Sequence, residues 1–373
     1  MKSHRKLYGT PFHLSRRLEE KLVDRYTSEM AKRATLRDVA LKAGVSHGMA
    51  GRVLGNYGSF SKATQRKVRA AARAVQYSPN VIAKALKTQR TKTAGVLVSD
   101  ITASFWTTMV RAIQDRAARD GYGIILFNSD EESRSEKASL ATLIERSMDG
   151  LIICPTIGNH SSLKKLSRGG TPLVLVDRKV SGIASPSIRV DNRAGAREAV
   201  SYLARLGHRR IAIIKGIDGV ETADERYAGY ADPLAEHRIP LQPSLVKDGR
   251  FMKNKAFEAT RELLRMKSRP SAIFVSNEVM ASGCMLALKE AGVRIPQDMS
   301  LVTFDDPVWT EYVNPPITSV SQPSYTMGIL AFDYLLSQIL DRERRAKRLD
   351  DLVLKTTLII RESCRELRGA PSR

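Results

Sequence analysis

Basic side chains are concentrated in one part of this sequence. Residues 30–92 hold 14 Lys and Arg residues against a single acid, Asp38, and so carry a net charge of +13 in a chain whose total is +22. A surface of this kind attracts the phosphates of nucleic acid, whereas a surface that only keeps a protein soluble mixes both signs. The composition predicts a nucleic-acid-binding module near the N-terminus, attached to a body of nearly balanced charge.

Residues 35–54 lie inside this basic segment and have the pattern of two short helices joined by a tight turn. Gly44 is expected to end the first helix, because glycine adopts the left-handed conformation at little cost, and Ser46 can cap the second helix. Apolar residues recur at helical spacing on one face of each helix: Leu36, Val39, Ala40 and Ala43, then Val45, Met49, Ala50 and Val53. The outward face of the second helix then carries His47, Gly48, Gly51 and Arg52. The pattern predicts a helix-turn-helix that enters a DNA major groove, with an ordinary helical hairpin as the alternative.

The segments around this motif complete the N-terminal part. We assign residues 33–78 to the DNA-binding domain and residues 79–92 to a hinge helix and linker beginning at Pro79. This hinge helix is too short to be stable alone, so we expect it to fold only against DNA and a second copy of itself. Residues 1–32 are predicted to be a disordered extension, and the sequence from Met30 to Arg33 is typical of a natural protein start.

From residue 93 onward, short apolar runs alternate with helical patterns, which predicts parallel sheets covered by helices. The apolar runs are Gly95–Val98, Ile124–Phe127, Leu151–Cys154, Leu173–Val176, Ile211–Ile214, Ala272–Val275 and Leu301–Phe304. The helical patterns are Phe105–Asp120, Asn192–Leu206, Phe251–Met266, Asn277–Ala291 and Thr326–Asp341. These are too many strands for one doubly wound sheet, so we expect two lobes, with a ligand outside the carboxyl ends of the strands. The lobes are assigned as 93–190 with 321–349 and as 191–320 with 350–364, followed by a tail at 365–373.

Other classes of protein have less support in the sequence. Cys154, Cys284 and Cys364 are odd in number and far apart, which indicates buried thiols in a reducing cytoplasm rather than disulfides or a zinc site. No apolar run is long enough to cross a membrane, and residues 1–29 lack the apolar centre of a signal peptide. The motifs GxSxG, HExxH, the Walker loop and GxGxxG are absent, so we predict no catalytic residue, cofactor or metal. An α/β enzyme and a periplasmic-type solute-binding protein stay as alternatives.

A series of short motifs follows in order along the chain. They are Thr35-Leu36-Arg37-Asp38-Val39-Ala40, Ala43-Gly44-Val45-Ser46, Arg52-Val53-Leu54, Tyr77-x-Pro79-Asn80-x-x-Ala83-x-x-Leu86, Val190-Asp191-Asn192, Leu206-Gly207-His208-Arg209-Arg210-Ile211, Glu225-Arg226-x-x-Gly229-Tyr230, Phe304-Asp305-Asp306 and Arg361-Glu362-Ser363. From about Lys32 to Ser363, the sequence resembles the lac repressor/galactose repressor (LacI/GalR) family of bacterial transcription factors. The resemblance implies an α/β protein with an all-α helix-turn-helix headpiece and a two-lobed, doubly wound core similar to periplasmic sugar-binding proteins. It also implies a homodimeric repressor that binds a palindromic operator in double-stranded DNA and responds to a small, sugar-like effector between the lobes.

The resemblance assigns positions that contact DNA. These are Thr35, Leu36, Ser46, His47, Gly48, Arg52, Asn80, Ala83 and Leu86. Arg52 can pair bidentately with guanine, and Leu86 is expected to wedge into the minor groove and bend the duplex. Gly48 and Gly51 each cost roughly 1 kcal/mol relative to alanine in a helix, so we expect a looser second helix that depends more on charge and on the hinge.

The same resemblance assigns effector-binding positions. These are Phe105, Trp106, Arg226, Phe251, Asn277 and Asp305. A guanidinium fork at Arg226 suits sugar hydroxyls or a carboxylate, and its alternative is a surface arginine. Asp305 can accept hydrogen bonds from ligand hydroxyls or form a capping turn with Asp306, and Asn277 can bind a ligand or cap the helix that follows it. The three aromatic residues can stack on a ligand or pack into the core. His208 and Asp191-Asn192 are expected to be structural.

Family members usually carry hydroxyl or β-branched residues where this chain has Met49, Ala50 and Gly51, and two short segments of the core also depart from the family's pattern. The usual Asn-Pro-Phe-Phe near the first strand is Ala103-Ser104-Phe105-Trp106 in this chain, and the usual Asn-Asp is Asn277-Glu278. These departures leave the effector class open. The tail after Ser363 contains one leucine, which is too few for the heptads that join two dimers, so we expect a dimer rather than a tetramer.

Overall fold

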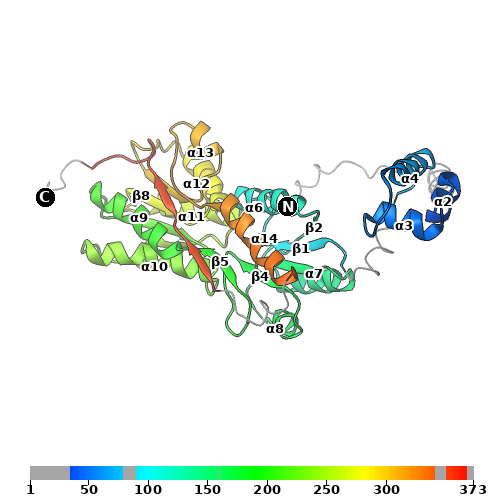
Figure 1. Ribbon diagram of the computed structural model, residues 1–373. Coiled ribbons are helices and arrows are strands. Elements are labelled where there is room, and N and C mark those ends of the chain that lie inside the picture. Colours follow the sequence, from blue (N-terminus) through cyan, green and yellow to red (C-terminus); the bar gives the residue numbers. More distant parts are fainter. Residues whose placement is uncertain (1–33, 79–89, 159, 341–349, 368–373) are drawn as a thin grey trace, which may run out of the picture. The chain divides into compact units, whose positions relative to one another are not determined.

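The chain divides into two compact units, Met1–Gln89 and Arg90–Arg373. The computed structural model describes residues 34–78, 90–158, 160–340 and 350–367 (Figure 1). The predicted extension at 1–32 and most of the predicted hinge, including Asn80, Ala83 and Leu86, lie outside the described residues.

The described part of the first unit is a small helical domain. Its helices are α2 (Leu36–Ala43), α3 (His47–Gly55) and α4 (Lys62–Ala74). Thr35 caps α2 in a capping box with Asp38, and Gly44 ends this helix at a φ of 63°. Ser46 caps α3 by accepting a hydrogen bond from the Met49 backbone N–H. The buried side chains of this domain are Val39, Ala40, Ala50, Val53, Val68, Ala71 and Ala72. The predicted helix-turn-helix is confirmed.

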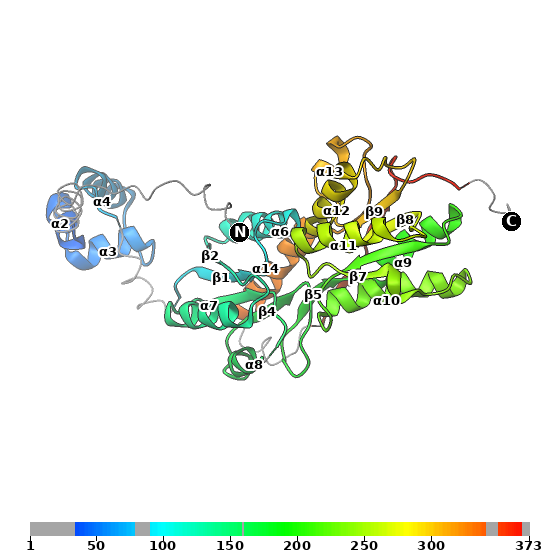
Figure 2. The same cartoon turned by 180° about the vertical axis from the view of Figure 1, so that it is seen from behind.

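The first lobe of the second unit contains a six-stranded sheet in the order β11-β5-β4-β3-β1-β2, in which every described pairing is parallel. Its strands are β1 (Thr93–Val98), β2 (Gly123–Asn128), β3 (Gly150–Ile153), β4 (Leu173–Val176), β5 (Ser187–Val190) and β11 (Leu352–Leu354). Its helices are α6 (Ser104–Arg119), α7 (Ser133–Glu145), α8 (Ser161–Arg168) and α14 (Ser324–Leu340). One apolar cluster joins the sheet to α6 and α14, and a second joins it to α7 and α8, so the helices cover both faces (Figures 1 and 2).

The second lobe repeats this architecture with the strand order β12-β10-β9-β8-β6-β7, and only the edge strand β12 is antiparallel among its described pairings. Its strands are β6 (Ile211–Lys215), β7 (Val246–Asp248), β8 (Ala272–Val275), β9 (Ser300–Phe304), β10 (Thr318–Ser321) and β12 (Thr357–Ile359). Its helices are α9 (Asn192–Arg205), α10 (Glu221–Glu236), the 3-10 turn η1 (Pro243–Leu245), α11 (Lys253–Arg265), α12 (Glu278–Glu290) and α13 (Trp309–Tyr312). Helices α9 and α10 pack on one face, and α11 and α12 pack on the other (Figure 2). The predicted two-lobed, doubly wound core is confirmed.

Two details of the sequence prediction are wrong. Residues 350–364 do not belong wholly to the second lobe, because β11 pairs with β5 in the first sheet while Leu352 and Leu354 pack on that lobe's core. The chain crosses between the lobes after β5, after β10 and after β11. The helix predicted from Phe251 begins at Lys253, because Arg250 and Phe251 adopt left-handed φ angles of 52° and 57° that end any helical continuation.

Paired helices approach closely where one of them carries a glycine. A Cβ atom on Gly229 of α10 would lie 2.3 Å from the Arg193 carbonyl oxygen of α9. A Cβ atom on Gly328 of α14 would lie 2.4 Å from the Met109 carbonyl oxygen of α6. Both distances are far shorter than a van der Waals contact, so glycine lets these backbones touch and sets the spacing of the two helices within each pair.

The cysteines are predicted to be buried thiols, and His208 is predicted to be a structural residue. Cys154 and Cys284 are buried free thiols, whereas Cys364 is only half-buried. His208 is fully buried, with Nδ1 2.8 Å from Ser271 Oγ and Nε2 3.1 Å from the Arg365 carbonyl oxygen, which fits its predicted structural role. Within the described ranges, none of the helices has the length and apolar character that a membrane span requires.

Candidate functional site

A cavity of about 490 Å³ lies between the two lobes at the carboxyl ends of their strands. The first lobe lines it with the segments that follow β1, β2 and β4 and with the start of α6. The second lobe contributes the segments after β6, β7, β8 and β9 together with α10, and Gln322 comes from the crossing after β10. This is the edge at which doubly wound folds place their ligands, because loops from many strands converge there.

All six residues predicted to bind an effector line this cavity: Phe105, Trp106, Arg226, Phe251, Asn277 and Asp305. Phe105 and Trp106 are 9% and 5% exposed and meet edge to face, with ring centroids 4.8 Å apart. They therefore belong to the first-lobe core and also form part of the cavity wall. Phe251 is half-buried, and its ring covers the backbone of Gly216 so closely that a side chain there would not fit.

Arg226 projects from α10 and is 4% exposed, so the alternative of a surface arginine is wrong. Its Nε donates to Asn192 Oδ1 at 2.8 Å, and its Nη1 donates to the Ser276 carbonyl oxygen at 2.6 Å. The guanidinium also lies over the Phe304 ring, with Cζ 3.8 Å from the ring centroid. Burial lowers the pKa of Arg226, and the nearby Asp305 and Asp177 carboxylates act in the opposite direction. The guanidinium is thus held in one orientation beside the cavity.

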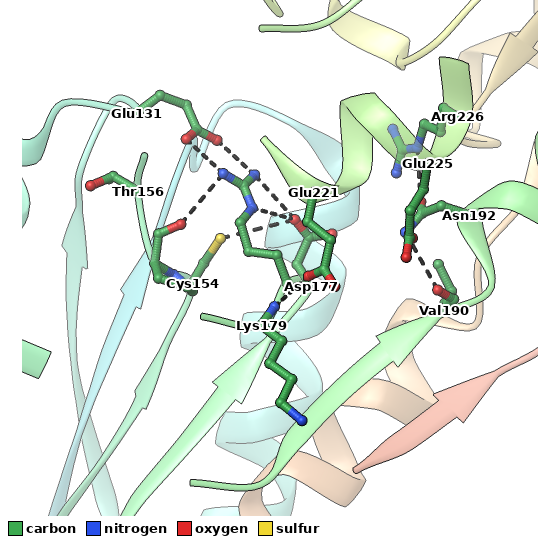
Figure 3. A network of polar contacts seen from close by, with 12 residues as sticks. Glu131, Cys154, Thr156, Asp177, Lys179, Val190, Asn192, Glu221, Glu225 and Arg226 are labelled. Atoms are coloured by element: carbon green, nitrogen blue, oxygen red, sulfur yellow. Dashed lines mark hydrogen bonds and ion pairs between the residues drawn. The ribbon is translucent and has the colours of Figure 1, made fainter. Parts of the chain in front are cut away.

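Asn192 connects Arg226 to the crossing between β5 and α9. Its Oδ1 accepts from Arg226, and its Nδ2 donates to Glu225 Oε2 at 3.1 Å (Figure 3). Glu221, one helical turn before Glu225, accepts from Arg189 Nη1 of the first lobe at 3.0 Å. These contacts support the predicted structural role of Asn192. They also show that the Asn192 side chain helps to orient the Arg226 guanidinium.

Arg178 and two acids form a second network on the first-lobe wall. Arg178 makes a bidentate pair with Glu131, with both nitrogen–oxygen distances at 2.8 Å, and it contacts Asp177 Oδ2 at 3.2 Å. Burial raises the pKa of Asp177, and the Arg178 charge partly offsets this effect. Figure 3 shows Glu131, Cys154 and Asp177 grouped in this network, beside the one that contains Asn192, Glu225 and Arg226.

Asp305 and Asn277 follow neighbouring strands of the second lobe. Asp305 adopts a φ of 74° and accepts from the Glu278 backbone N–H at 3.2 Å and from Gln322 Nε2 at 2.5 Å. Asp305 therefore connects three segments. Its side chain bonds to Glu278 and Gln322, which holds it in place without the alternative capping turn with Asp306. Asn277 caps α12, because its Oδ1 accepts from the Met280 backbone N–H at 2.9 Å, and it also lines the cavity.

The predicted DNA-contacting residues that the structure describes belong to α2 and α3 or to their caps. His47, Gly48 and Arg52 are exposed on α3, whereas Leu36 is half-buried against the domain core. The hydroxyl groups of Thr35 and Ser46 cap helices, which positions the first turns of α2 and α3 for backbone contacts to phosphate. The exposed face of α4 adds Lys62, Arg66, Lys67, Arg69 and Arg73 to the positive surface.

Sequence reasoning missed other residues that line the cavity: Asp100, Asp130, Glu131, Asp177, Arg178, Arg250 and Gln322. Most of them follow directly on strands, so their position after an apolar run was a usable signal. The described residues contain no group of three or more His, Cys, Asp or Glu side chains suited to hold a metal. The arrangement offers carboxylates, amides, a buried guanidinium and aromatic faces, which suits the binding of a polar small molecule.

Comparisons with known proteins agree with this arrangement. A model of the bacterial regulatory proteins of the lacI family matches residues 35–80, and a model of the periplasmic binding protein-like domain matches residues 200–364. The chain is 33% identical to the probable HTH-type transcriptional regulator EndR of Paenibacillus polymyxa, over 87% of this chain and 96% of that protein. It is 31% identical to the HTH-type transcriptional repressor CytR of Escherichia coli, over 82% of this chain and 90% of that protein.

Solved structures show the same likeness. A lac repressor dimer bound to operator and the anti-inducer ONPF superposes with a TM-score of 0.79 at 28% identity, covering 90% of this chain and all of that chain. A complex of the transcriptional regulator CelR with cellobiose gives a TM-score of 0.66 at 28% identity, covering 89% of this chain and all of that chain.

Proposed function

The chain belongs to the LacI family of bacterial transcriptional regulators, and we propose that it is a repressor whose operator binding is controlled by a sugar-like effector. The observation that carries this proposal is the polar cavity at the carboxyl ends of both sheets, lined by all six residues predicted for the effector. In a single chain, that cavity accompanies a basic helix-turn-helix domain. The combination favours a ligand-controlled DNA-binding protein over an enzyme.

The DNA-binding role is proposed for the exposed face of α3. Arg52 is exposed and can donate two parallel hydrogen bonds to a guanine, while His47 and Gly48 lie on the same helix. The positive residues of α4 would neutralise phosphates. Asn80, Ala83 and Leu86 are proposed to act in the hinge, with Leu86 in the minor groove.

The effector role is proposed for the cavity between the lobes. Arg226, Asn277 and Asp305 would bind hydroxyl groups, and the rings of Trp106 and Phe251 would cover the apolar face of a sugar. The structure of the similar regulator CelR with bound cellobiose supports a sugar. An effector changes operator affinity only if it binds one arrangement of the lobes better than another.

The proposal includes a homodimer, because a palindromic operator is matched by the two-fold symmetry of its protein. The solved lac repressor dimer on operator supports this assembly. We place the protein in the cytoplasm with the DNA that it would regulate. The domains are proposed as 33–78 for DNA binding, 79–92 for the hinge and 93–364 for the effector-binding core.

Two measurements on the purified full-length protein test this function. Selection of bound duplexes from a random library should yield a palindromic sequence. A thermal-shift screen of neutral sugars, sugar acids and nucleobases should yield a ligand that changes the affinity of the protein for that sequence. A bound ligand raises the unfolding temperature by mass action. Ligand binding without any selected DNA sequence would instead identify a solute-binding protein, and chemical conversion of the ligand would identify an enzyme.

A further inference from the structure

Helix α6 begins without a cap of its own. The residue before Ser104 is Ala103, whose φ of −81° and ψ of 137° are typical of an N-cap residue, yet its side chain makes no capping hydrogen bond. The first backbone N–H groups of a helix have no partner within the helix, and Ser, Thr, Asp or Asn normally supplies one. Alanine cannot supply an acceptor, so the start of this 16-residue helix needs an acceptor from elsewhere.

That acceptor comes from the other lobe. Glu278, in the first turn of α12, accepts from Ser104 Oγ with its Oε2 at 2.6 Å and from the Phe105 backbone N–H with its Oε1 at 3.3 Å. The glutamate is 5% exposed, so water contributes little to its solvation. A carboxylate at a helix N-terminus is also favoured by the helix dipole. Both lobes therefore share one capping interaction across the cleft.

Both side chains that form this contact, Ser104 and Glu278, depart from the family's pattern, and so does Ala103 beside them. An Asn at position 103 would cap α6 locally, and a Pro at position 104 would have no hydroxyl group to donate. In this chain, Ala103 provides no cap, Ser104 provides the hydroxyl, and Glu278 has one methylene more than the usual Asp. Three departures on two lobes thus lie together at the start of α6, where one removes the local cap and the other two form the hydrogen bond between the lobes.

The contact is joined to the wall of the cavity on both sides. On the second lobe, the Glu278 backbone N–H donates to Asp305, which also accepts from Gln322 at the crossing between the lobes. On the first lobe, the capped turn of α6 carries Phe105 and Trp106, which line the cavity. A rotation of the lobes about their crossings would separate Glu278 from α6 and uncap that turn.

We propose that Glu278 is an interlobe latch, which caps α6 when the cleft is closed and leaves its first turn uncapped when the cleft opens. Closure then orders the turn that carries Phe105 and Trp106, and opening lets it fray. The latch stabilises the closed arrangement of the lobes. It thereby sets how much binding free energy an effector must supply to close the cleft. This regulatory consequence rests on the proposed effector site, whereas the latch is testable without effector or DNA.

Hydrogen exchange on the full-length protein tests the cap. Glu278→Met keeps the length of the side chain but removes both acceptors. Amide exchange in residues 104–109 should accelerate by roughly tenfold, as expected when one amide, the Phe105 N–H, loses its hydrogen bond to a charged group. Adding Ala103→Ser gives α6 its own cap and should reverse most of this acceleration. Glu290→Met, at the exposed end of α12, is the matched control and should leave exchange in α6 unchanged.

The distance between the lobes tests the latch. Spin labels at Lys137→Cys on α7 and Glu262→Cys on α11, with Cys364→Ser, would report the separation of the lobes by pulsed electron resonance. Glu278→Met should lengthen or broaden the distance distribution, and Ala103→Ser should not restore it, because a local cap does not join the lobes. The latch is refuted if Glu278→Met matches Glu290→Met in both measurements, or if the distance distribution is unchanged while exchange accelerates.

Discussion

The buried His208 makes the stability of the second lobe depend on pH in a way that the structure specifies. Its ring is fully buried, with Nε2 facing the Arg365 carbonyl oxygen of the C-terminal segment and Nδ1 facing Ser271 Oγ, just before β8. A carbonyl oxygen only accepts hydrogen bonds, so Nε2 carries the proton of the neutral ring and Nδ1 can accept from Ser271. Burial lowers the pKa of His208 from 6.5 to about 4, because the charged ring would lose its hydration.

The sign of the effect follows from where the proton binds. Between pH 6.5 and pH 4, the unfolded chain holds a proton on His208 and the folded protein does not, so acidification favours unfolding. The neutral ring's contribution to stability is complete above pH 6.5 and is lost as the pH falls toward 4. This difference between the pKa values of the unfolded and folded states lowers the free energy of unfolding by about 2–3 kcal/mol at pH 4.5.

Urea unfolding of wild type and His208→Gln between pH 7.5 and pH 4.5 measures this contribution. Glutamine has a donor and an acceptor at similar reach but does not titrate. Between pH 7.5 and pH 4.5, the free energy of unfolding should therefore fall by about 2–3 kcal/mol less in the variant than in wild type. Carboxylates contribute equally to both proteins and cancel in the comparison. Parallel curves for the two proteins would show that the histidine is not held neutral by burial, and the argument would fail.

Three further outcomes test the proposed sites, and a fourth tests the packing of α9 on α10. Arg52→Ala should lose about 1–3 kcal/mol of operator affinity per half-site in a gel-shift assay while the fold is retained, and an unchanged footprint would contradict its base contact. Operator affinity should fall steeply between 50 and 200 mM salt, roughly with the number of phosphates neutralised, and a flat response would argue against the basic surface. Arg226→Met should abolish the thermal shift caused by the selected ligand without changing operator binding; a full shift would exclude Arg226 from the site. Gly229→Ala should lower the free energy of unfolding by about 1–3 kcal/mol, because the new Cβ overlaps the Arg193 carbonyl, whereas Gly123→Ala meets open space and serves as control.

The buried strands could be predicted because burial on both faces leaves a continuous apolar run. The predicted strands Leu173–Val176 and Ala272–Val275 coincide with β4 and β8, which lie inside their sheets. The strands that escaped prediction are short and lie at sheet edges, as β7 and β12 do, or contain polar residues, as β10 (Thr318–Ser321) does. Their pairing depends on neighbours that are distant in sequence, which a local pattern does not contain. The same dependence explains why β11 was assigned to the wrong lobe.

The candidate site was partly predictable for a related reason. A residue such as Asp305 stands out because it follows an apolar run, and the same rule would have found Asp177 and Arg178 after β4. The partnership of Arg178 with Glu131 joins loops 47 residues apart, and that of Glu278 with Ser104 spans 174 residues. Only the folded arrangement of loops and lobes reveals such pairs.

The backbone of the cavity wall supports its assignment as a site. Asp130, Glu131, Asp177, Arg250, Phe251 and Asp305 all line the cavity and all have φ angles between 52° and 74°. In this region a side chain is disfavoured, and glycine would relieve the strain at no steric cost. The chain instead places acids, an arginine and an aromatic ring at these turns, together with a buried guanidinium at Arg226. Strained turns that retain such side chains around one cavity are better explained by the need to bind a ligand than by the stability of the fold.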